Sequence, residues 1–412
     1  MRNRHPELLI PASSLEVLKT AVMFGADAVY IGGEAFGLRA KAKNFSMEDM
    51  KEGVQFAHEH GARVHVTVNI LAHNDDLEGV AEYLKELKEI GPDALIIADP
   101  AIFMLAKEIC PEIERHVSTQ ANNTNYGTFN FWWNLGAKRV VTARELSLKE
   151  IREIRAHIPA EMEIESFIHG AMCISYSGRC LLSNFFTGRD ANQGACTHPC
   201  RWKYSVVEET RPGEYMPVYE NERGTYIFNS KDLCMIEHIP EMIDAGIDSF
   251  KIEGRMKTAL YVATVARTYR KAIDDYLEDP KKYEANMPWY RDQISNCTYR
   301  QFTTGFYFGK PGDESQIYDS NTYIKEYTYL GIIGGIKDGM YRIEQRNKFS
   351  VGETVEIMKP DGQNVEVTVE KIVDENGQEQ ESAPHPKQVL YVALSGEASV
   401  YDILRRQEGV TE

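Results

Sequence analysis

The chain has 412 residues, 43% of them hydrophobic, and its formal net charge at pH 7 is −16. The hydrophobic fraction is ordinary for a globular protein, and no run of about 18 apolar residues predicts a membrane-spanning helix. The acidic balance argues against nucleic-acid binding over a broad surface, which needs phosphate neutralisation, but it permits a local basic cleft. The polar start, Met1 to Glu7, lacks the apolar core of a signal peptide, so we expect a cytoplasmic protein.

Short apolar segments alternate with helical segments along the first 280 residues. Between the apolar segments, stretches such as 146–158 carry apolar residues at helical spacing. Eight alternations predict parallel strands that close into a (β/α)8 TIM-like barrel. An open doubly wound sheet is the alternative, weakened because no Gly-x-Gly-x-x-Gly follows the first strand. The eight strand-like segments begin at Leu8, Ala28, Val64, Ala94, His116, Arg139, Glu163 and Ser249.

The alternation breaks between the seventh and eighth segments. Residues 171–228 form an insertion that holds four of the seven cysteines, and residues 229–245 predict a helix before the last strand. After about residue 323 the pattern changes to short strand-like segments with Asp-Gly turns, which predict a small all-β barrel. The predicted domains are therefore a barrel with a cysteine loop over 1–280, a linker over 281–322 and a C-terminal β-barrel over 323–412.

The cysteines of the insertion form two close pairs, Cys173-x6-Cys180 and Cys196-x3-Cys200. An iron–sulfur cluster needs four thiolates in one small volume, and short spacings cost little loop-closure entropy. Zinc is the alternative ligand, although structural zinc sites usually use tighter Cys-x2-Cys pairs.

The other cysteines, and a histidine between the second pair, are weaker candidates. His198 could serve as a ligand, but Cys196 and Cys200 fill that role without it. We expect Cys234 to be a packing residue at the start of a helix, and Cys110 and Cys297 to be packing residues as well.

Polar residues follow the strands at their carboxyl ends, where TIM barrels place their chemistry. Arginines there are natural partners for the carboxylates of a small anionic substrate, although arginines and glutamates at barrel rims also pair with one another. We expect Glu165, His169, Lys251 and Glu253 to be catalytic. The expected substrate-binding residues are Arg39, Gln120, Arg144, Asn229, Lys231, Asp232 and Arg255.

Several segments resemble peptidase family U32. The similar segments are ESFIHGAMCISYSGRCLLS from Glu165, GRDANQGACTHPCRWKY from Gly188, KIEGRMK from Lys251 and the C-terminal β-domain. The sequence offers no HExxH pair and no Gly-x-Ser-x-Gly elbow to support the proteolysis that the family name implies. Within the family, the length and the short β-domain look most like the members that hydroxylate the wobble uridine of tRNA to 5-hydroxyuridine.

The resemblance implies a [4Fe-4S] cluster on Cys173, Cys180, Cys196 and Cys200, and prephenate as the oxygen-donating co-substrate. The implied partners are the anticodon loop of tRNA and a shorter U32 paralogue. A U32-type peptidase, and a hydroxylase of ribosomal RNA or of a small molecule, remain the alternatives. For RNA contact we expect stacking on Trp202 and Tyr204 and a basic group near the last strand. That group comprises Arg201, Lys203, Lys251, Arg255, Lys257, Arg267, Arg270 and Lys271.

Overall fold

The structure is a computed structural model. It describes residues 5–34, 36, 44–173, 180–189, 196–197, 199–201, 231–297, 301–311 and 327–408, with four two-residue strands between 206 and 225.

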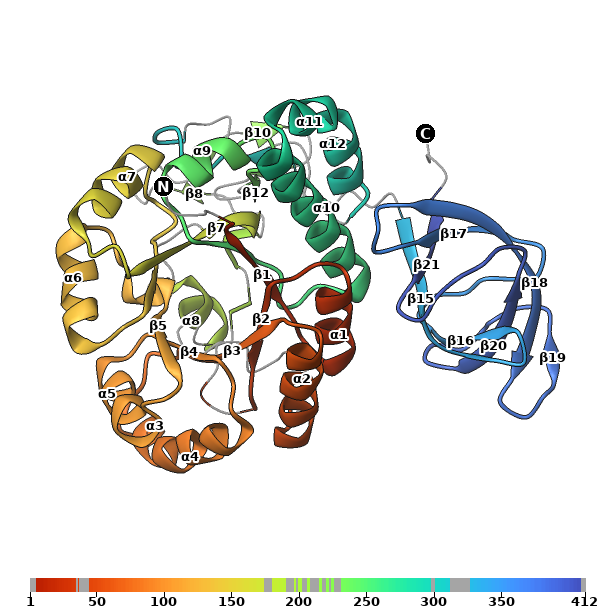
Figure 1. The fold of residues 1–412 in the computed structure, drawn as a ribbon, viewed down its shortest axis with the longest axis horizontal. Helices are drawn as coiled ribbons and strands as arrows, with labels where there is room; N and C mark the ends of the chain where they lie inside the picture. Colours follow the sequence, from red (N-terminus) through yellow and green to blue (C-terminus); the bar gives the residue numbers. More distant parts are fainter. Residues whose placement is uncertain are drawn as a thin grey trace.

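The first part of the chain is the predicted closed barrel of eight parallel strands (Figure 1). Neighbours in sequence are neighbours in the sheet from β1 to β7, and β13 closes the ring by pairing with both β7 and β1. The barrel strands are β1 (Glu7–Pro11), β2 (Ala28–Gly32), β3 (Arg63–Val68), β4 (Ala94–Ile97), β5 (Glu114–Val117), β6 (Arg139–Val141), β7 (Glu163–Ala171) and β13 (Ser249–Ile252).

Helices surround the ring, and their ends carry the expected capping residues. Ser14 and Thr258 accept hydrogen bonds from the first turns of α1 and α10, and Ser147 forms a capping box with Glu150 at α7. The helices around the barrel are α1 (Leu15–Met23), α2 (Met47–Glu59), α3 (Asn74–Leu77), α4 (Val80–Ile90), α5 (Pro100–Ile109), α6 (Tyr126–Leu135), α7 (Leu148–His157), α9 (Ile239–Asp244) and α10 (Ala259–Glu278).

The segment before β13 differs from its prediction. Only α9 is helical, while residues 232–234 form strand β12 (Asp232–Cys234), which pairs antiparallel with the end of β7 and parallel with β14 (Phe302–Thr303). The reason is that β7 continues past the barrel as far as Ala171 and so offers a free edge. The prediction that Cys234 begins a helix is therefore wrong.

The segment expected to be a linker folds against the barrel where the structure describes it. Helices α11 (Pro280–Ala285) and α12 (Met287–Ser295) pack on α10, and Tyr283, Tyr290 and Tyr307 are buried in the main core. The Tyr290 hydroxyl donates to Asp275 at 2.6 Å. Tyrosine is well suited to this role because its ring packs while its hydroxyl finds a partner.

The C-terminal part is a second, antiparallel barrel, as predicted. Six strands close in the order β17-β21-β15-β16-β20-β18, with β17 pairing back to β18, and β19 adds to β18. The strands are β15 (Tyr327–Lys337), β16 (Met340–Gln345), β17 (Thr354–Met358), β18 (Asn364–Asp374), β19 (Glu379–Gln380), β20 (Val389–Leu394) and β21 (Ile403–Gln407).

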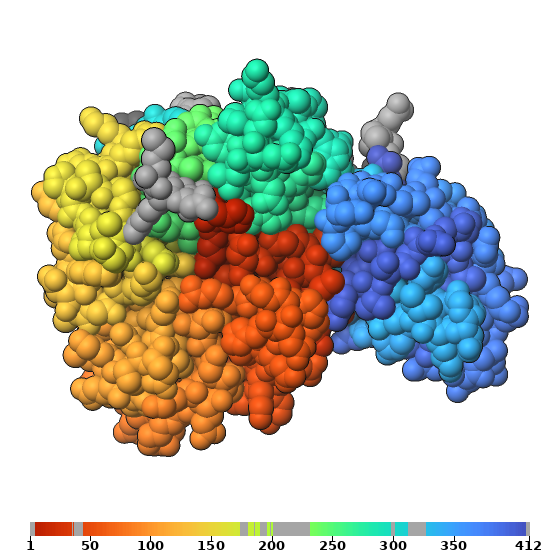
Figure 2. Space-filling view, in the orientation of Figure 1, coloured from red at the N-terminus to blue at the C-terminus, as the bar shows by residue number. Residues whose placement is uncertain are grey.

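This β-barrel packs on α1 and α10, the helices beside the β1–β13 junction (Figure 2). The guanidinium of Arg267, on α10, donates to the Lys359 carbonyl at 2.8 Å, and Arg346 pairs with Glu16 of α1. Arg267 therefore joins the two domains, and Arg270 pairs with Asp27 at 2.7 Å, so neither serves the basic surface expected near the last strand.

Among the described residues, the helices are too short or too polar to cross a membrane.

Candidate functional site

The four clustered cysteines come from three neighbouring segments. Cys173 follows β7, Cys180 precedes helix α8 (Leu182–Thr187), and Cys200 lies in a 3-10 turn, Pro199–Arg201, that packs on α8. The segment with Cys196 is fixed to the same helix, because the Thr197 amide donates to the Ser183 hydroxyl at 3.0 Å. The segments that carry Cys180, Cys196 and Cys200 thus meet at α8, and the Cys173 thiol lies close enough to Cys180 to affect it electrostatically.

The thiols suit a shared metal or cluster. All four are free and at least partly exposed. Burial raises the pKa of the Cys180 thiol, and the nearby Cys173 and Cys196 thiols add to the rise because like charges would meet there. A bound cation reverses this effect and deprotonates its thiol ligands, so the residues present fit a thiolate-held cluster.

The remaining cysteines do not join this group. Cys234 lies on β12 with its sulfur 3.7 Å from the Tyr269 hydroxyl, and burial raises its pKa to about 11. Cys110 and Cys297 are buried and donate to backbone carbonyls of their own turns. Cys110 and Cys297 thus have the surroundings of packing residues, whereas Cys234 is half-buried beside a cleft.

The cysteine group lies at the carboxyl end of the barrel, to which β7 leads. Helix α8 is seen within the ring of strands in Figure 1. This end is the one at which TIM barrels carry their sites. The side chains that point into the barrel interior, called the lumen below, therefore form the floor beneath the cysteine group.

The lumen is filled by charged side chains where most TIM barrels hold aliphatic ones. The guanidinium of Arg139 bonds Glu7 at 2.5 Å, Glu163 at 2.7 Å and Glu165 at 3.1 Å, and Lys251 donates to Glu165 at 2.6 Å. Burial opposes the charge of Arg139, but Glu7 and Glu165 hold its pKa well above the ordinary value. Glu165 and Lys251, both expected to be catalytic, are thus an ion pair within the barrel.

Two buried histidines stand beside this pair and were not among the expected site residues. His65 of β3 and His116 of β5 meet edge to face with ring centres 4.8 Å apart, close to Glu165. Burial lowers the pKa of both well below the ordinary value, so both are neutral at pH 7. The signal was present in the sequence: the alternation in RVHVTV places His65 on the same face as Arg63 and Thr67.

Above the lumen, Arg255 lies across the barrel mouth. Its guanidinium donates to the Thr67 hydroxyl at 2.9 Å, and its side chain is 5% exposed. It lies against Gly32 at the end of β2, where a Cβ atom would come within 2.7 Å of the guanidinium. Because Gly32 has no side chain, the Arg255 guanidinium can occupy the space beside it.

Arg144 and Glu253 form the opposite side of the mouth. The Arg144 guanidinium lies 4.1 Å from the centre of the Phe167 ring, donates to the Ala171 carbonyl at 3.1 Å and is 3.7 Å from Glu253. These contacts hold the planar cation on the strand that leads to Cys173. Arg144 and Arg255 thus both lie at the carboxyl ends of barrel strands, and a guanidinium is well suited to bind a carboxylate.

His169 does not belong to this mouth. Its ring packs against Tyr261, Tyr269 and Phe302, and its Nδ1 is 3.3 Å from the Tyr269 hydroxyl. The β7–β13 pairing shifts register between Phe167 and His169, which turns His169 outward toward α10. His169 therefore lies apart from the other residues expected to be catalytic, because its ring is enclosed between sheet and helix.

This placement of His169 predicts a pH dependence of stability. Burial lowers its pKa from the ordinary 6.5 to about 4, so between these values the unfolded chain binds the proton and the folded chain does not. Burying the neutral His169 ring costs no stability from protonation above pH 6.5. As the pH falls from 6.5 toward 4, the free energy of unfolding decreases by about 3 kcal/mol on account of this residue. In urea unfolding followed from pH 7 to 4, the His169→Gln variant should lose less stability than the wild type. Equal losses would contradict this account.

The other expected binding residues are dispersed. Gln120 is buried beside the mouth in a short 3-10 turn, whereas Asp232 is buried on β12. Lys231 lines a separate cleft with Cys234 and Phe302, outside the ring of barrel strands. Arg39, Asn229, His198, Trp202, Lys203 and Tyr204 lie outside the described residues.

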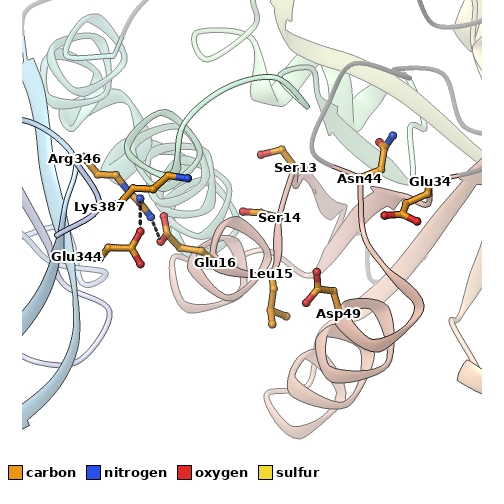
Figure 3. A pocket seen from close by; sticks show the side chains of 10 residues that line it. All are labelled: Ser13, Ser14, Leu15, Glu16, Glu34, Asn44, Asp49, Glu344, Arg346 and Lys387. Atoms are coloured by element: carbon orange, nitrogen blue, oxygen red, sulfur yellow. Dashed lines mark hydrogen bonds and ion pairs between the residues drawn. The ribbon is translucent and has the colours of Figure 1, made fainter. Parts of the chain in front are cut away.

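A second cleft, of about 680 Å³, lies between α1, α2 and the C-terminal barrel (Figure 3). Arg346 projects into it and pairs there with Glu16 and Glu344. Glu34 and Asp49 also line it, so its carboxylates outnumber its cations, and an RNA phosphate would be repelled.

Comparison with known proteins agrees with the resemblance seen in the sequence. The chain is 43% identical to the tRNA hydroxylation protein P1 of Bacillus subtilis (strain 168), over 98% of this chain and 95% of that protein. It is 39% identical to the tRNA hydroxylation protein P of Escherichia coli (strain K12), over 92% and 91%. It is also 40% identical to the 23S rRNA 5-hydroxycytidine C2501 synthase of Escherichia coli (strain K12), over 66% of this chain and 40% of that protein.

The family assignment covers both domains. Residues 325–405 match the peptidase family U32 C-terminal domain, which corresponds to the second barrel. Residues 13–317 match peptidase family U32 itself, a stretch that includes the TIM-like barrel, the four cysteines and helices α11 and α12. This chain therefore belongs to peptidase family U32.

Proposed function

We propose that this chain is an RNA-modifying enzyme that hydroxylates the wobble uridine of tRNA to 5-hydroxyuridine, with a [4Fe-4S] cluster and with prephenate as oxygen donor. The observation that carries the proposal is the 43% identity to a tRNA hydroxylation protein over nearly the full length of both chains. The cluster and the oxygen donor come from the family resemblance. The cluster is also supported by the position of its expected ligands, which lie on neighbouring segments at the carboxyl end of the barrel: Cys173, Cys180, Cys196 and Cys200.

The residues of the mouth have separate roles in this proposal. Arg255 and Arg144 bind the two carboxylates of the donor, one from each side of the opening. Glu165 and Lys251 form a fixed ion pair beneath it and keep the lumen closed to bulk water. The cluster, when bound, supplies one-electron chemistry to the space above them. A wobble base reaches this space at little cost, because an anticodon loop is already unpaired.

A nucleoside digest of RNA tests the function directly. In a strain that lacks this gene and any paralogue, tRNA should contain no 5-hydroxyuridine by liquid chromatography and mass spectrometry, and expression of this chain should restore it. The 23S ribosomal RNA of the same cells should be analysed in parallel. Restoration of 5-hydroxycytidine in ribosomal RNA, with tRNA unchanged, would support the ribosomal RNA alternative, and no change in either RNA would refute the proposal.

The contact between Gly32 and Arg255 gives a test of the mouth that leaves the arginine in place. A Cβ atom at position 32 would displace the Arg255 guanidinium, since the two would lie 2.7 Å apart. We expect Gly32→Ala to lower the rate of 5-hydroxyuridine formation about 100-fold, the scale on which a 1 Å misplacement of a positioning group acts. Arg255→Gln should have a similar effect.

Gly335→Ala is the matched control, because the added Cβ atom at this position makes only an ordinary contact of 3.9 Å in the second barrel. Its modification rate should equal that of the wild type. If Gly32→Ala also modifies tRNA at the wild-type rate, with cluster content unchanged, Arg255 does not bind the donor.

A further inference from the structure

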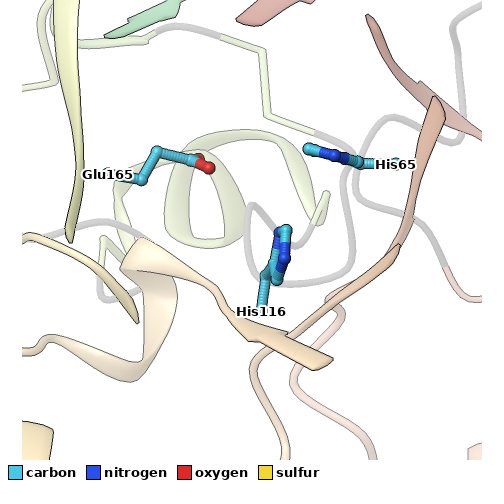
Figure 4. A group of neighbouring side chains, drawn as sticks. All are labelled: His65, His116 and Glu165. Carbon is cyan, nitrogen blue, oxygen red and sulfur yellow. The ribbon is translucent and has the colours of Figure 1, made fainter. Parts of the chain in front are cut away.

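Three side chains from alternate strands converge in the lumen, away from the cysteines. His65, His116 and Glu165 come from β3, β5 and β7 and point toward one another (Figure 4). One nitrogen or oxygen atom of each lies within 4.8 Å of one such atom of the other two, and all three residues are fully buried. Two imidazoles and one carboxylate in this arrangement are a common metal-binding set.

The histidines present ring nitrogens that the described residues leave unsatisfied. Within the described ranges, neither Nδ1 nor Nε2 of His65 has a hydrogen-bond partner, and Nδ1 of His116 has none either. Buried polar atoms without partners are rare and costly, so one such nitrogen on each of two adjacent rings indicates a bound species between them.

The surroundings of His116 match those of a metal ligand. Its Nε2 lies 3.0 Å from a carboxylate oxygen of Glu114. We assign the proton to Nε2, because a carboxylate accepts it there, and Nδ1 is then the ring nitrogen whose lone pair is left for a metal ion. Ligating histidines usually donate their other N–H to a carboxylate in this way.

The ion network around Glu165 carries a small excess of negative charge. Glu165 accepts from Lys251 and Arg139, yet each of its oxygens retains a second lone pair. In the ion network that includes Glu165, carboxylates outnumber amino and guanidinium groups by five to four among the described residues. The network consists of Glu7, Asp93, Glu114, Glu163 and Glu165 with Arg63, Lys138, Arg139 and Lys251.

We propose that His65, His116 and Glu165 form a buried site for one divalent first-row transition-metal ion, separate from the four-cysteine site. Imidazole and carboxylate ligands suit iron(II), manganese(II) and zinc(II), whereas magnesium and calcium prefer oxygen ligands alone. The ion coordinates one ring nitrogen of each histidine and one carboxylate oxygen of Glu165, and so joins β3, β5 and β7 across the lumen. Because the site is closed to solvent, the ion enters as the barrel folds.

Metal content distinguishes this site from the cysteine group. Cells that produce the protein are grown with added manganese(II) or zinc(II), and the protein is purified anaerobically and desalted. Total metal is measured by inductively coupled plasma mass spectrometry, and labile sulfide is measured in parallel. We expect the wild type to hold about one metal equivalent more than His65→Phe or His116→Phe, at equal sulfide, whether or not tRNA is modified.

His169→Phe is the matched control, since it replaces a buried histidine outside the lumen, and it should retain the additional equivalent. Equal metal content in the wild type and both lumen variants would overturn the proposal. If the lumen variants do not fold, anomalous diffraction from wild-type crystals decides. A peak between the three side chains supports the site, and ordered water alone overturns it.

Discussion

Replacing Cys173, Cys180, Cys196 or Cys200 with alanine, one at a time, should give a colourless protein and abolish 5-hydroxyuridine in tRNA. A four-thiolate cluster that loses one ligand is expected to lose its iron and sulfide, because cluster binding and local folding are coupled. The loss should be complete in all four variants, since α8 and the 3-10 turn hold the segments that carry these cysteines against one another. Iron, labile sulfide and visible absorbance of anaerobically purified protein provide the measurement.

Cys234→Ala and Cys297→Ala are the matched controls. Both positions lie outside the cysteine group, and both variants should keep about four irons and four sulfides per chain, as a [4Fe-4S] cluster requires. A cluster that survives Cys200→Ala but is lost in Cys234→Ala would mean that the fourth ligand is Cys234. Stoichiometric zinc without sulfide in the wild type would mean that the cluster assignment is wrong.

Arg139→Ala should destabilise the barrel severely. Arg139 is 2% exposed and is the common partner of Glu7, Glu163 and Glu165. Removing one partner of a buried ion pair costs about 3–5 kcal/mol, because an uncompensated charge remains in the interior. We therefore expect a large drop in the urea midpoint, or loss of soluble protein.

The control is Arg291→Ala, which removes an ion pair of similar chemistry at the surface. Arg291 is 60% exposed where it meets Glu237. Exposed pairs contribute about 0–1 kcal/mol, so the midpoint should scarcely change. Similar midpoints for Arg139→Ala and Arg291→Ala would show that the lumen charges are not coupled to folding.

The barrel could be predicted from sequence because its signal is periodic. The segments predicted to be strands overlap all eight barrel strands, since apolar runs alternate with helices of apolar spacing except after the seventh run, and a closed parallel ring satisfies that order. The small β-barrel could be predicted because its strand-like segments are separated by Asp-Gly turns. The region between β7 and β13 lacks this periodicity, which explains why β12 was mistaken for the beginning of a helix.

The site was predictable only where side-chain direction follows from strand alternation. Alternation along β7 would place His169 on the same face as Glu165 and Phe167. The register shift turns the His169 side chain to the other face, and no feature of the sequence predicts this shift. Conversely, His65 and His116 follow alternation but were overlooked, because a lone histidine in a strand resembles a core residue. Their significance depends on contacts between strands far apart in the sequence.

The junction between β1 and β13 has a consequence for synthesis of the protein on the ribosome. Glu7 meets Ser249 across 242 residues of chain, so the ring cannot close until about three fifths of the protein has been made. At about 5–20 residues per second, the first strand waits roughly 10–50 s with one hydrogen-bonding edge exposed. Chaperone occupancy of the nascent chain should therefore peak before residue 250 emerges, and rapid overexpression should yield aggregates of unclosed barrels.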